Sequence, residues 1–90
     1  MDSDTIVVSM ETPLNDIKQK IRDACVEGKM KHLAILSGTN YFSAIQYSDG
    51  TYDLWFDDDH VLGYASADIV AEFVFAECRI IAGFDNWRKS

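Results

Sequence analysis

The stretch Tyr41–Tyr64 constrains the fold most, because alternating apolar and polar residues are interrupted there by tight-turn signals. Asp49-Gly50 suits a two-residue type I′ loop, since both residues tolerate the positive φ angles that such a loop requires. A two-residue loop at this position places Tyr47 opposite Tyr52. With Asp58-Asp59 as a second turn, the stretch is predicted to form three short antiparallel strands.

This register divides the side chains between two faces of the sheet, since successive residues of a strand point to opposite sides. One face is predicted to be apolar, with Ile45 opposite Leu54 and Ser43 opposite Phe56. His60 is expected opposite Asp57. The second face is predicted to be aromatic and acidic, carrying Phe42, Asp53, Trp55, Asp57, Leu62 and Tyr64, with Asp49, Asp58 and Asp59 at its rims. A shift of one residue would exchange the faces.

The segments on either side of this stretch predict helices and further strands. Thr5–Ser9 is β-branched and of strand length, and Lys31–Ser37 resembles a short buried strand. Between them, Thr12-Pro13 is a helix-start signal and Gly28 a stop signal. The apolar residues of this first helix recur at helical spacing: Leu14, Ile17, Ile21, Ala24 and Cys25.

A second helix is expected from Ala67 to Ala82, with Ser66 as its N-cap, and with Gly83 ending it before an aromatic tail. Its circumference is apolar apart from a stripe formed by Asp68, Glu72, Phe75 and Arg79. A helix this apolar is expected to pack between the sheet and something else, so Glu72 and Phe75 are predicted contacts with a partner or a second copy. A strand over Glu72–Ile81 is the alternative.

The sequence therefore predicts an α+β fold in one domain, residues 1–90. We expect an antiparallel or mixed sheet of 4–5 strands with two helices, in the order β-α-β-β-β-β-α. The strands Thr5–Ser9 and Lys31–Ser37 pair in parallel if the helix between them forms a crossover, and the antiparallel arrangement is the alternative.

Charge is distributed unevenly along the chain. The net charge is −7, and between His32 and Cys78 there are eight carboxylates and no lysine or arginine. Such a block repels nucleic acid and attracts basic protein surfaces, because potentials add over a surface. The alternative is that the acidic turns only keep a small protein in solution.

No catalytic motif is present, neither a Gly-x-Ser-x-Gly sequence nor a glycine-rich phosphate loop. Asp57-Asp58-Asp59-His60 could supply oxygen and nitrogen ligands, but consecutive aspartates in a tight turn point in different directions. Turn aspartates more commonly bond nearby backbone N–H groups. Cys25 and Cys78 lack redox or zinc spacing and are expected to be reduced. We expect no cofactor and no catalytic activity, with a small metal-dependent enzyme using Asp57–His60 as an alternative.

The location of the protein is inferred from two features. The first residues are acidic where a secretory signal is basic, and no apolar run approaches membrane-spanning length. We therefore expect a cytoplasmic protein without a membrane partner.

The function that these features favour is that of a small acidic inhibitor or adaptor. It is predicted to occupy a basic groove of a partner protein, such as one that holds nucleic acid, with aspartates in place of phosphates. Phage-encoded anti-defence inhibitors and immunity proteins are analogues in size and charge. The predicted contact residues are Asp49, Asp53, Trp55, Asp57, Asp58, Asp59 and Tyr64. The alternative is a homodimeric interaction module packed through the second helix.

Overall fold

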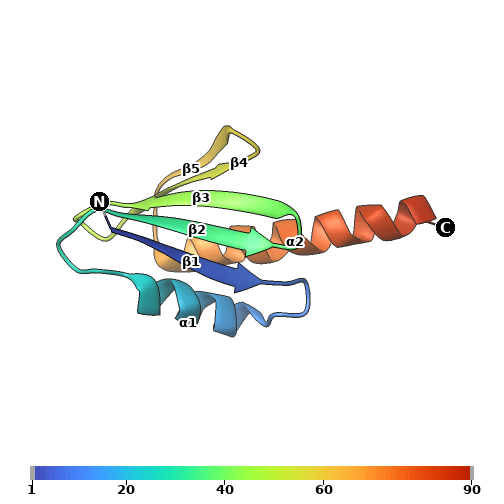
Figure 1. Cartoon of the computed structure of the whole chain (residues 1–90), viewed down its shortest axis with the longest axis horizontal. Coiled ribbons are helices and arrows are strands. Elements are labelled where there is room, and N and C mark those ends of the chain that lie inside the picture. The colour runs from blue at the N-terminus through green and yellow to red at the C-terminus, as the bar shows by residue number, and fades with distance from the viewer. Residues whose placement is uncertain (1, 90) are drawn as a thin grey trace.

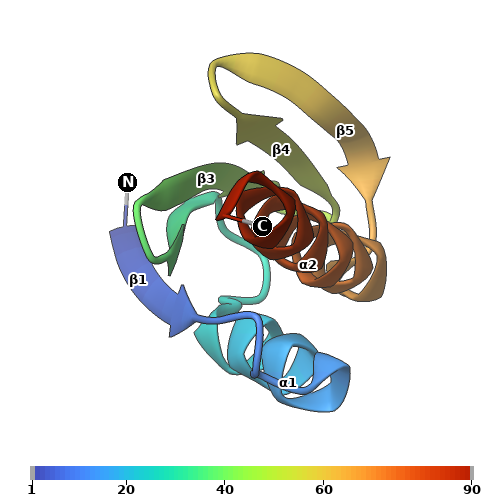
Figure 2. The same cartoon turned by 90° about the vertical axis from the view of Figure 1, so that its right-hand side faces the viewer.

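The computed structural model describes the backbone of residues 2–89 and the side chains of residues 3–80, and it shows a sheet with two helices on one face (Figures 1 and 2). The elements follow the predicted order: β1 (Asp2–Val8), α1 (Leu14–Ala24), β2 (Lys31–Ser37), β3 (Asn40–Gln46), β4 (Tyr52–Phe56), β5 (Asp59–Ala65) and α2 (Ala67–Lys89). The predicted α+β class and element order are confirmed.

The sheet has five strands in sequence order, β1 to β5. β1 and β2 pair in parallel, with α1 as the crossover between them, and the three later pairings are antiparallel. The mixed sheet predicted from the strand-helix-strand pattern of Thr5–Ser37 is therefore present. Figure 2, viewed along α2, shows β3, β4 and β5 curving around this helix.

The two helices enclose the core with one face of the sheet. The apolar stripe of α1 is buried as predicted, with Ile17 and Ile21 fully covered. From α2, Val70, Ala71 and Val74 are also fully covered. The strands contribute alternate residues to this core: Ile6, Val8, Leu33, Ile35, Phe42, Ala44, Tyr52 and Leu54. Burial of this kind stabilises a fold by about 1.5–3 kcal/mol for each large apolar side chain.

Polar groups inside the core are paired. The buried Gln46 side chain accepts a hydrogen bond from the Val26 N–H at 3.2 Å and donates one to the Val26 carbonyl at 2.9 Å. It thereby holds the α1–β2 connection against β3. The Tyr52 hydroxyl contacts the Cys25 thiol. Burial raises the pKa of Tyr52, and the contact with Cys25 raises it further. Both cysteines are free thiols, as predicted.

The predicted register of β3 and β4 is wrong by one residue. The Tyr47 N–H donates to the Thr51 carbonyl at 2.8 Å, which closes a three-residue loop, Ser48–Gly50, in place of the two-residue loop at Asp49-Gly50. Gly50 has φ 88°, as expected of the left-handed residue that ends such a loop. Asp49 stabilises this loop, since its carboxylate accepts hydrogen bonds from the N–H and the hydroxyl of Thr51. These bonds lower the pKa of Asp49.

The register shift moves the residues of β3 to the opposite face from the one predicted. Phe42 pairs with Phe56 in the core, where their rings stack at 4.5 Å, and Phe42 is not part of an exposed aromatic face. Ile45 pairs with Asp53, and Ser43 with Trp55, on the other face. Leu62, also predicted on the binding face, packs against the core.

The second turn is also one residue away from its predicted position. Phe56 pairs with Asp59, so the turn residues are Asp57 and Asp58, with φ of 52° and 65°. His60 consequently pairs with Trp55 and not with Asp57. Two aspartates in left-handed conformation form this turn, which normally favours Asn-Gly.

The ends of the helices differ from prediction as well. α1 begins at Leu14 with Pro13 as its N-cap residue, because the Thr12 hydroxyl accepts a hydrogen bond from the Ser9 N–H instead of capping the helix. It ends at Ala24, before Gly28. In α2, Ser66 caps the first turn through a 3.2 Å bond from the Ile69 N–H, and helix replaces the alternative strand at Glu72–Ile81. The backbone of α2 continues through Gly83, and the side chains of the predicted aromatic tail lie outside the described residues.

We predict that relieving the left-handed turn stabilises the protein. Asp58→Gly should raise the free energy of unfolding by about 0.5 kcal/mol or more, because glycine adopts positive φ without steric cost. Asp58→Ala removes the same charge but keeps the steric conflict, so it should lower stability by about 0.5–1 kcal/mol. Urea unfolding of the three proteins measures the difference. Equal shifts for both variants would contradict a conformational cause.

Candidate functional site

The face of the sheet opposite the helices is uncovered. Its strand residues are exposed or partly exposed, and none of those described is buried: Thr5, Val7, His32, Ala34, Leu36, Tyr41, Ser43, Ile45, Tyr47, Asp53 and Trp55. Val7 is 66% exposed and Tyr41 46%. We call this set of residues the open face. It is mixed in character: His32 and Ser43, 2.9 Å apart, lie among apolar residues at its centre, and the rings of Tyr41, Tyr47 and Trp55 lie toward its ends and β4.

Five of the seven predicted partner-binding residues lie on or beside the open face near β4. Asp53 and Trp55 lie on it, and Asp57, Asp58 and Asp59 lie at or next to the β4–β5 turn that ends it. Asp49 is at the opposite end of β4, where it stabilises its own loop. The sequence placed these residues correctly in the hairpins even though it assigned the wrong β3 side chains beside them.

Tyr64, the seventh predicted contact residue, lies on β5 in an unusual conformation. β5 has register irregularities opposite β4, because Tyr52 pairs with Ala65 whereas Leu54 pairs with Leu62. The extra residue forms a bulge at Gly63-Tyr64, where Tyr64 has φ 52° and is 80% exposed. Positive φ is a true outlier for a bulky residue and costs of order 1–3 kcal/mol. The bulge turns the tyrosine ring outward, and its ring lies 6.1 Å from that of Tyr47.

Asp53 is the centre of a hydrogen-bonded cluster on the open face. It accepts a 2.6 Å bond from the Tyr47 hydroxyl and a 3.2 Å bond from the Tyr64 N–H, and His60 Nε2 lies 3.6 Å from its Oδ2. The Tyr47 bond is the main reason that the pKa of Asp53 is lowered and that of Tyr47 raised. Asp53 is thus held as an anion. The sequence did not indicate the role of Tyr47, because the predicted register placed it on the opposite face.

Glycine at position 63 leaves room for this cluster. A Cβ atom there would lie 3.3 Å from His60 Cε1 and 3.7 Å from Asp53 Oδ1. The His60 ring in turn lies 5.0 Å from that of Trp55. The imidazole therefore fills the space between Trp55 and the β5 bulge, and it faces Asp53 rather than the aspartates of the turn.

Two acids of α2 have basic partners on α1. Arg22 pairs with Asp68, and Lys18 lies 3.9 Å from Glu72. Arg79 stacks over Phe75 at 3.4 Å and donates a hydrogen bond to the Thr12 carbonyl. The stripe Asp68, Glu72, Phe75 and Arg79 therefore packs against α1 and the loop before it, so the predicted contact residues Glu72 and Phe75 contribute to the packing of the two helices.

The acids of the β4–β5 turn differ from Asp68 and Glu72 in their neighbours. Among the described side chains, no lysine or arginine forms an ion pair with Asp57, Asp58 or Asp59. Asp68 and Glu72 are therefore paired with α1, whereas three consecutive aspartates next to the open face have no lysine or arginine partner among the described side chains. Within that same part of the chain, no three histidine, cysteine, aspartate or glutamate residues are placed to hold a metal ion.

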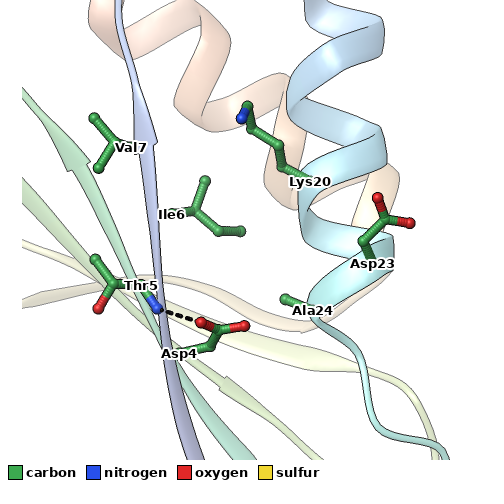
Figure 3. A pocket seen from close by; sticks show the side chains of 7 residues that line it. All are labelled: Asp4, Thr5, Ile6, Val7, Lys20, Asp23 and Ala24. Carbon is green, nitrogen blue, oxygen red and sulfur yellow. Dashed lines mark hydrogen bonds between the residues drawn. The ribbon is translucent and has the colours of Figure 1, made fainter.

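A groove of about 250 Å³ lies elsewhere, between β1 and α1 (Figure 3). Its lining residues are Asp4, Thr5, Ile6, Val7, Lys20, Asp23 and Ala24. The Asp4 carboxylate accepts a hydrogen bond from the Thr5 N–H and lies 3.7 Å from Lys31 Nζ. The charges around the groove are mixed in sign, and none of the predicted site residues lines it.

Comparison with known proteins gives no relative: no family model, no curated protein and no solved structure matches the chain. Nor does the described part of the chain contain a helix with the length and hydropathy needed to span a membrane.

We predict that the Tyr47–Asp53 hydrogen bond makes stability depend on pH. A carboxyl group whose pKa is lowered by folding stabilises the fold above its unfolded pKa of about 4, and this contribution is lost as pH falls through the folded pKa. Tyr47→Phe should return the pKa of Asp53 toward its ordinary value. The difference in unfolding free energy between wild type and Tyr47→Phe should therefore be larger at pH 7 than at pH 3, as measured by urea unfolding.

Carbon-detected NMR titration of the Asp53 carboxyl group checks the cause directly. Its midpoint should lie higher in Tyr47→Phe than in the wild type. An unchanged midpoint would show that the phenol does not hold Asp53 in its charged form.

Proposed function

We propose that the domain is a protein-binding module, an inhibitor or adaptor, that docks the β4–β5 end of its open face on a basic surface of a partner protein. The observation that supports the proposal most is the pairing of an uncovered aromatic sheet surface with aspartates that have no lysine or arginine partner among the described side chains. Aromatic side chains supply contact area that loses water on binding, and the surrounding acids supply steering.

The charge distribution favours a basic partner. Three consecutive aspartates are concentrated at the turn beside the open face without a lysine or arginine partner among the described side chains, whereas Asp68 and Glu72 of α2 are paired with α1. Unscreened negative potential next to an apolar surface accelerates encounter with positive surfaces. A groove that holds nucleic acid offers such a surface, and carboxylates at the turn would take the places of phosphates. The cytoplasm is the compartment we propose for this encounter.

We predict that partner capture depends on the turn acids specifically. The variant Asp57→Asn/Asp58→Asn/Asp59→Asn should lose most of the basic proteins that the immobilised wild type retains from a cell lysate. The matched control is Glu11→Gln/Asp16→Asn/Glu27→Gln, which removes the same charge from exposed residues on and around α1. It should retain them. Capture by the wild type should weaken as NaCl rises from 50 to about 500 mM, because the Debye length falls below about 5 Å.

Two results would contradict the proposal. Equal loss in both variants would show that only net charge matters, and equal retention in both would show that the turn acids do not bind the partner. Quantitative mass spectrometry of the eluted proteins measures each outcome.

The second candidate function is a homodimeric interaction module packed through α2. The observation that favours it is a row of exposed apolar residues on α2. Ile69 is 47% exposed and Ile80 63% exposed, Ala76 is exposed between them, and Phe73, at the same helical spacing, is partly buried against the core. Phe75 does not belong to this row, since Arg79 covers it.

We predict that a dimer of this kind would be insensitive to salt, because its contact is apolar. Sedimentation equilibrium should then show a dimer at both 50 and about 500 mM NaCl, and Ile69→Ser/Ile80→Ser should dissociate it. The turn-acid variant serves as the control and should leave it intact. A monomer at high micromolar concentration would contradict this second candidate.

A further inference from the structure

Four described carboxylates lie close to a basic side chain, and Asp53 is the least exposed of them. Its basic neighbour is a histidine, whereas the other three have a lysine or an arginine. Its side chain is 15% exposed, compared with 51% for Asp4, 45% for Asp68 and 57% for Glu72. Each of these three exposed acids has a lysine or arginine beside it, whereas Asp53 has only His60 at 3.6 Å. Removing a carboxylate from water is costly unless a full positive charge compensates it. Among these four carboxylates, Asp53 is the least exposed, and its charge is stabilised by hydrogen bonds and His60 instead of a lysine or arginine.

The hydrogen bonds of Asp53 leave room for a cation. One bond reaches each carboxylate oxygen, from the Tyr47 hydroxyl to Oδ2 and from the Tyr64 N–H to Oδ1. An ionised carboxylate has about four acceptor positions, and with His60 Nε2 at 3.6 Å from Oδ2 about one or two remain. Asp53 lies on the open face, where part of its side chain is exposed.

The Tyr64 ring lies at the edge of the same cluster. Its side chain is 80% exposed, and its N–H bond to Asp53 Oδ1 holds the residue next to the carboxylate. The neighbouring Tyr47 ring lies 6.1 Å away at an interplanar angle of 27°. The accessible tyrosine rings therefore lie beside the carboxylate that has no lysine or arginine partner among the described side chains.

We propose that Tyr47, Asp53 and Tyr64 form a receptor for the guanidinium group of a partner arginine. The inference rests on the proposed function and identifies the side chain that the open face recognises. A guanidinium donates hydrogen bonds in its plane to the carboxylate while its face stacks on a tyrosine ring. An ammonium can approach the carboxylate but cannot stack in this way, so the receptor prefers arginine to lysine.

A guanidinium group that both stacks on an aromatic ring and donates to an oxygen atom already occurs within this chain, at Arg79. The Arg79 guanidinium lies 3.4 Å from the centre of the Phe75 ring, with a backbone carbonyl as its acceptor. That internal site is filled by the chain's own arginine. The receptor at Asp53 offers similar surroundings with a charged acceptor and two rings.

The test is an NMR titration of the isotope-labelled full chain with N-acetyl-arginine amide. The Asp53 carboxyl, the Tyr64 N–H and the Tyr47 ring should shift and saturate together. N-acetyl-citrulline amide, which has the same shape without the charge, should leave them unchanged. N-acetyl-lysine amide should bind about tenfold more weakly, the equivalent of about 1.4 kcal/mol. Equal affinity for the lysine and arginine compounds would overturn the preference for guanidinium.

Two variants locate the receptor. Asp53→Asn should weaken arginine binding about tenfold by removing the charge. Tyr64→Asn removes the ring at an exposed position, tolerates positive φ and keeps the N–H that bonds Asp53, so it should fold normally and also bind more weakly. Retention of full affinity in the folded Tyr64→Asn protein would overturn the proposal.

The outcomes separate this inference from the proposed function. If the arginine-dependent shifts gather at Asp57–Asp59 and not at Asp53, the receptor is wrong while docking on a basic surface stands. If no part of the open face shifts and the turn-acid variant also captures partners as the wild type does, both are wrong.

Discussion

The loop between β3 and β4 is the constraint on which the rest of the sheet depends. It is closed by the Tyr47–Thr51 backbone bond and stabilised by the Asp49 carboxylate, and Gly50 supplies the positive φ at its end. Because side chains alternate along a strand, the loop length decides which residues of β3 face the helices. With the observed three-residue loop, Phe42 faces the core. With a two-residue loop, it would lie on the exposed face.

The same register creates the open face. Once Phe42, Ala44 and Gln46 lie beneath the helices, Ser43, Ile45 and Tyr47 necessarily lie on the other side with Asp53 and Trp55. Both helices pack on one face through their buried apolar residues, and Arg22–Asp68, Lys18–Glu72 and the Arg79 contacts join them at the surface. Two basic residues of α1 are thereby paired with acids of α2. The acids of the β4–β5 turn are left without such partners among the described side chains.

Two places in the β4–β5 hairpin hold residues in unfavourable conformations. Asp57 and Asp58 have positive φ in the turn, and Tyr64 has positive φ at the bulge. Glycine and asparagine adopt positive φ more readily than tyrosine, and aspartate tolerates it better than most residues. Both places lie beside the open face and carry either a negative charge or an exposed aromatic ring.

The sequence by itself determined the α+β class, the order of elements, the buried stripe of α1 and the concentration of acids between His32 and Cys78, because periodicity and composition are local properties. It left the pairing of β1 with β2 open, and the structure shows that pairing to be parallel. Only the tertiary structure decided the register, the pairing of Asp53 with Tyr47 and the bulge that exposes Tyr64. Asp49-Gly50 is compatible with loops of two or three residues, and the choice depends on hydrogen bonds from Thr51 and on which face the helices bury. Likewise, the neutralisation of Asp68 and Glu72 depends on α1 and α2 lying side by side, a contact between segments far apart in the chain.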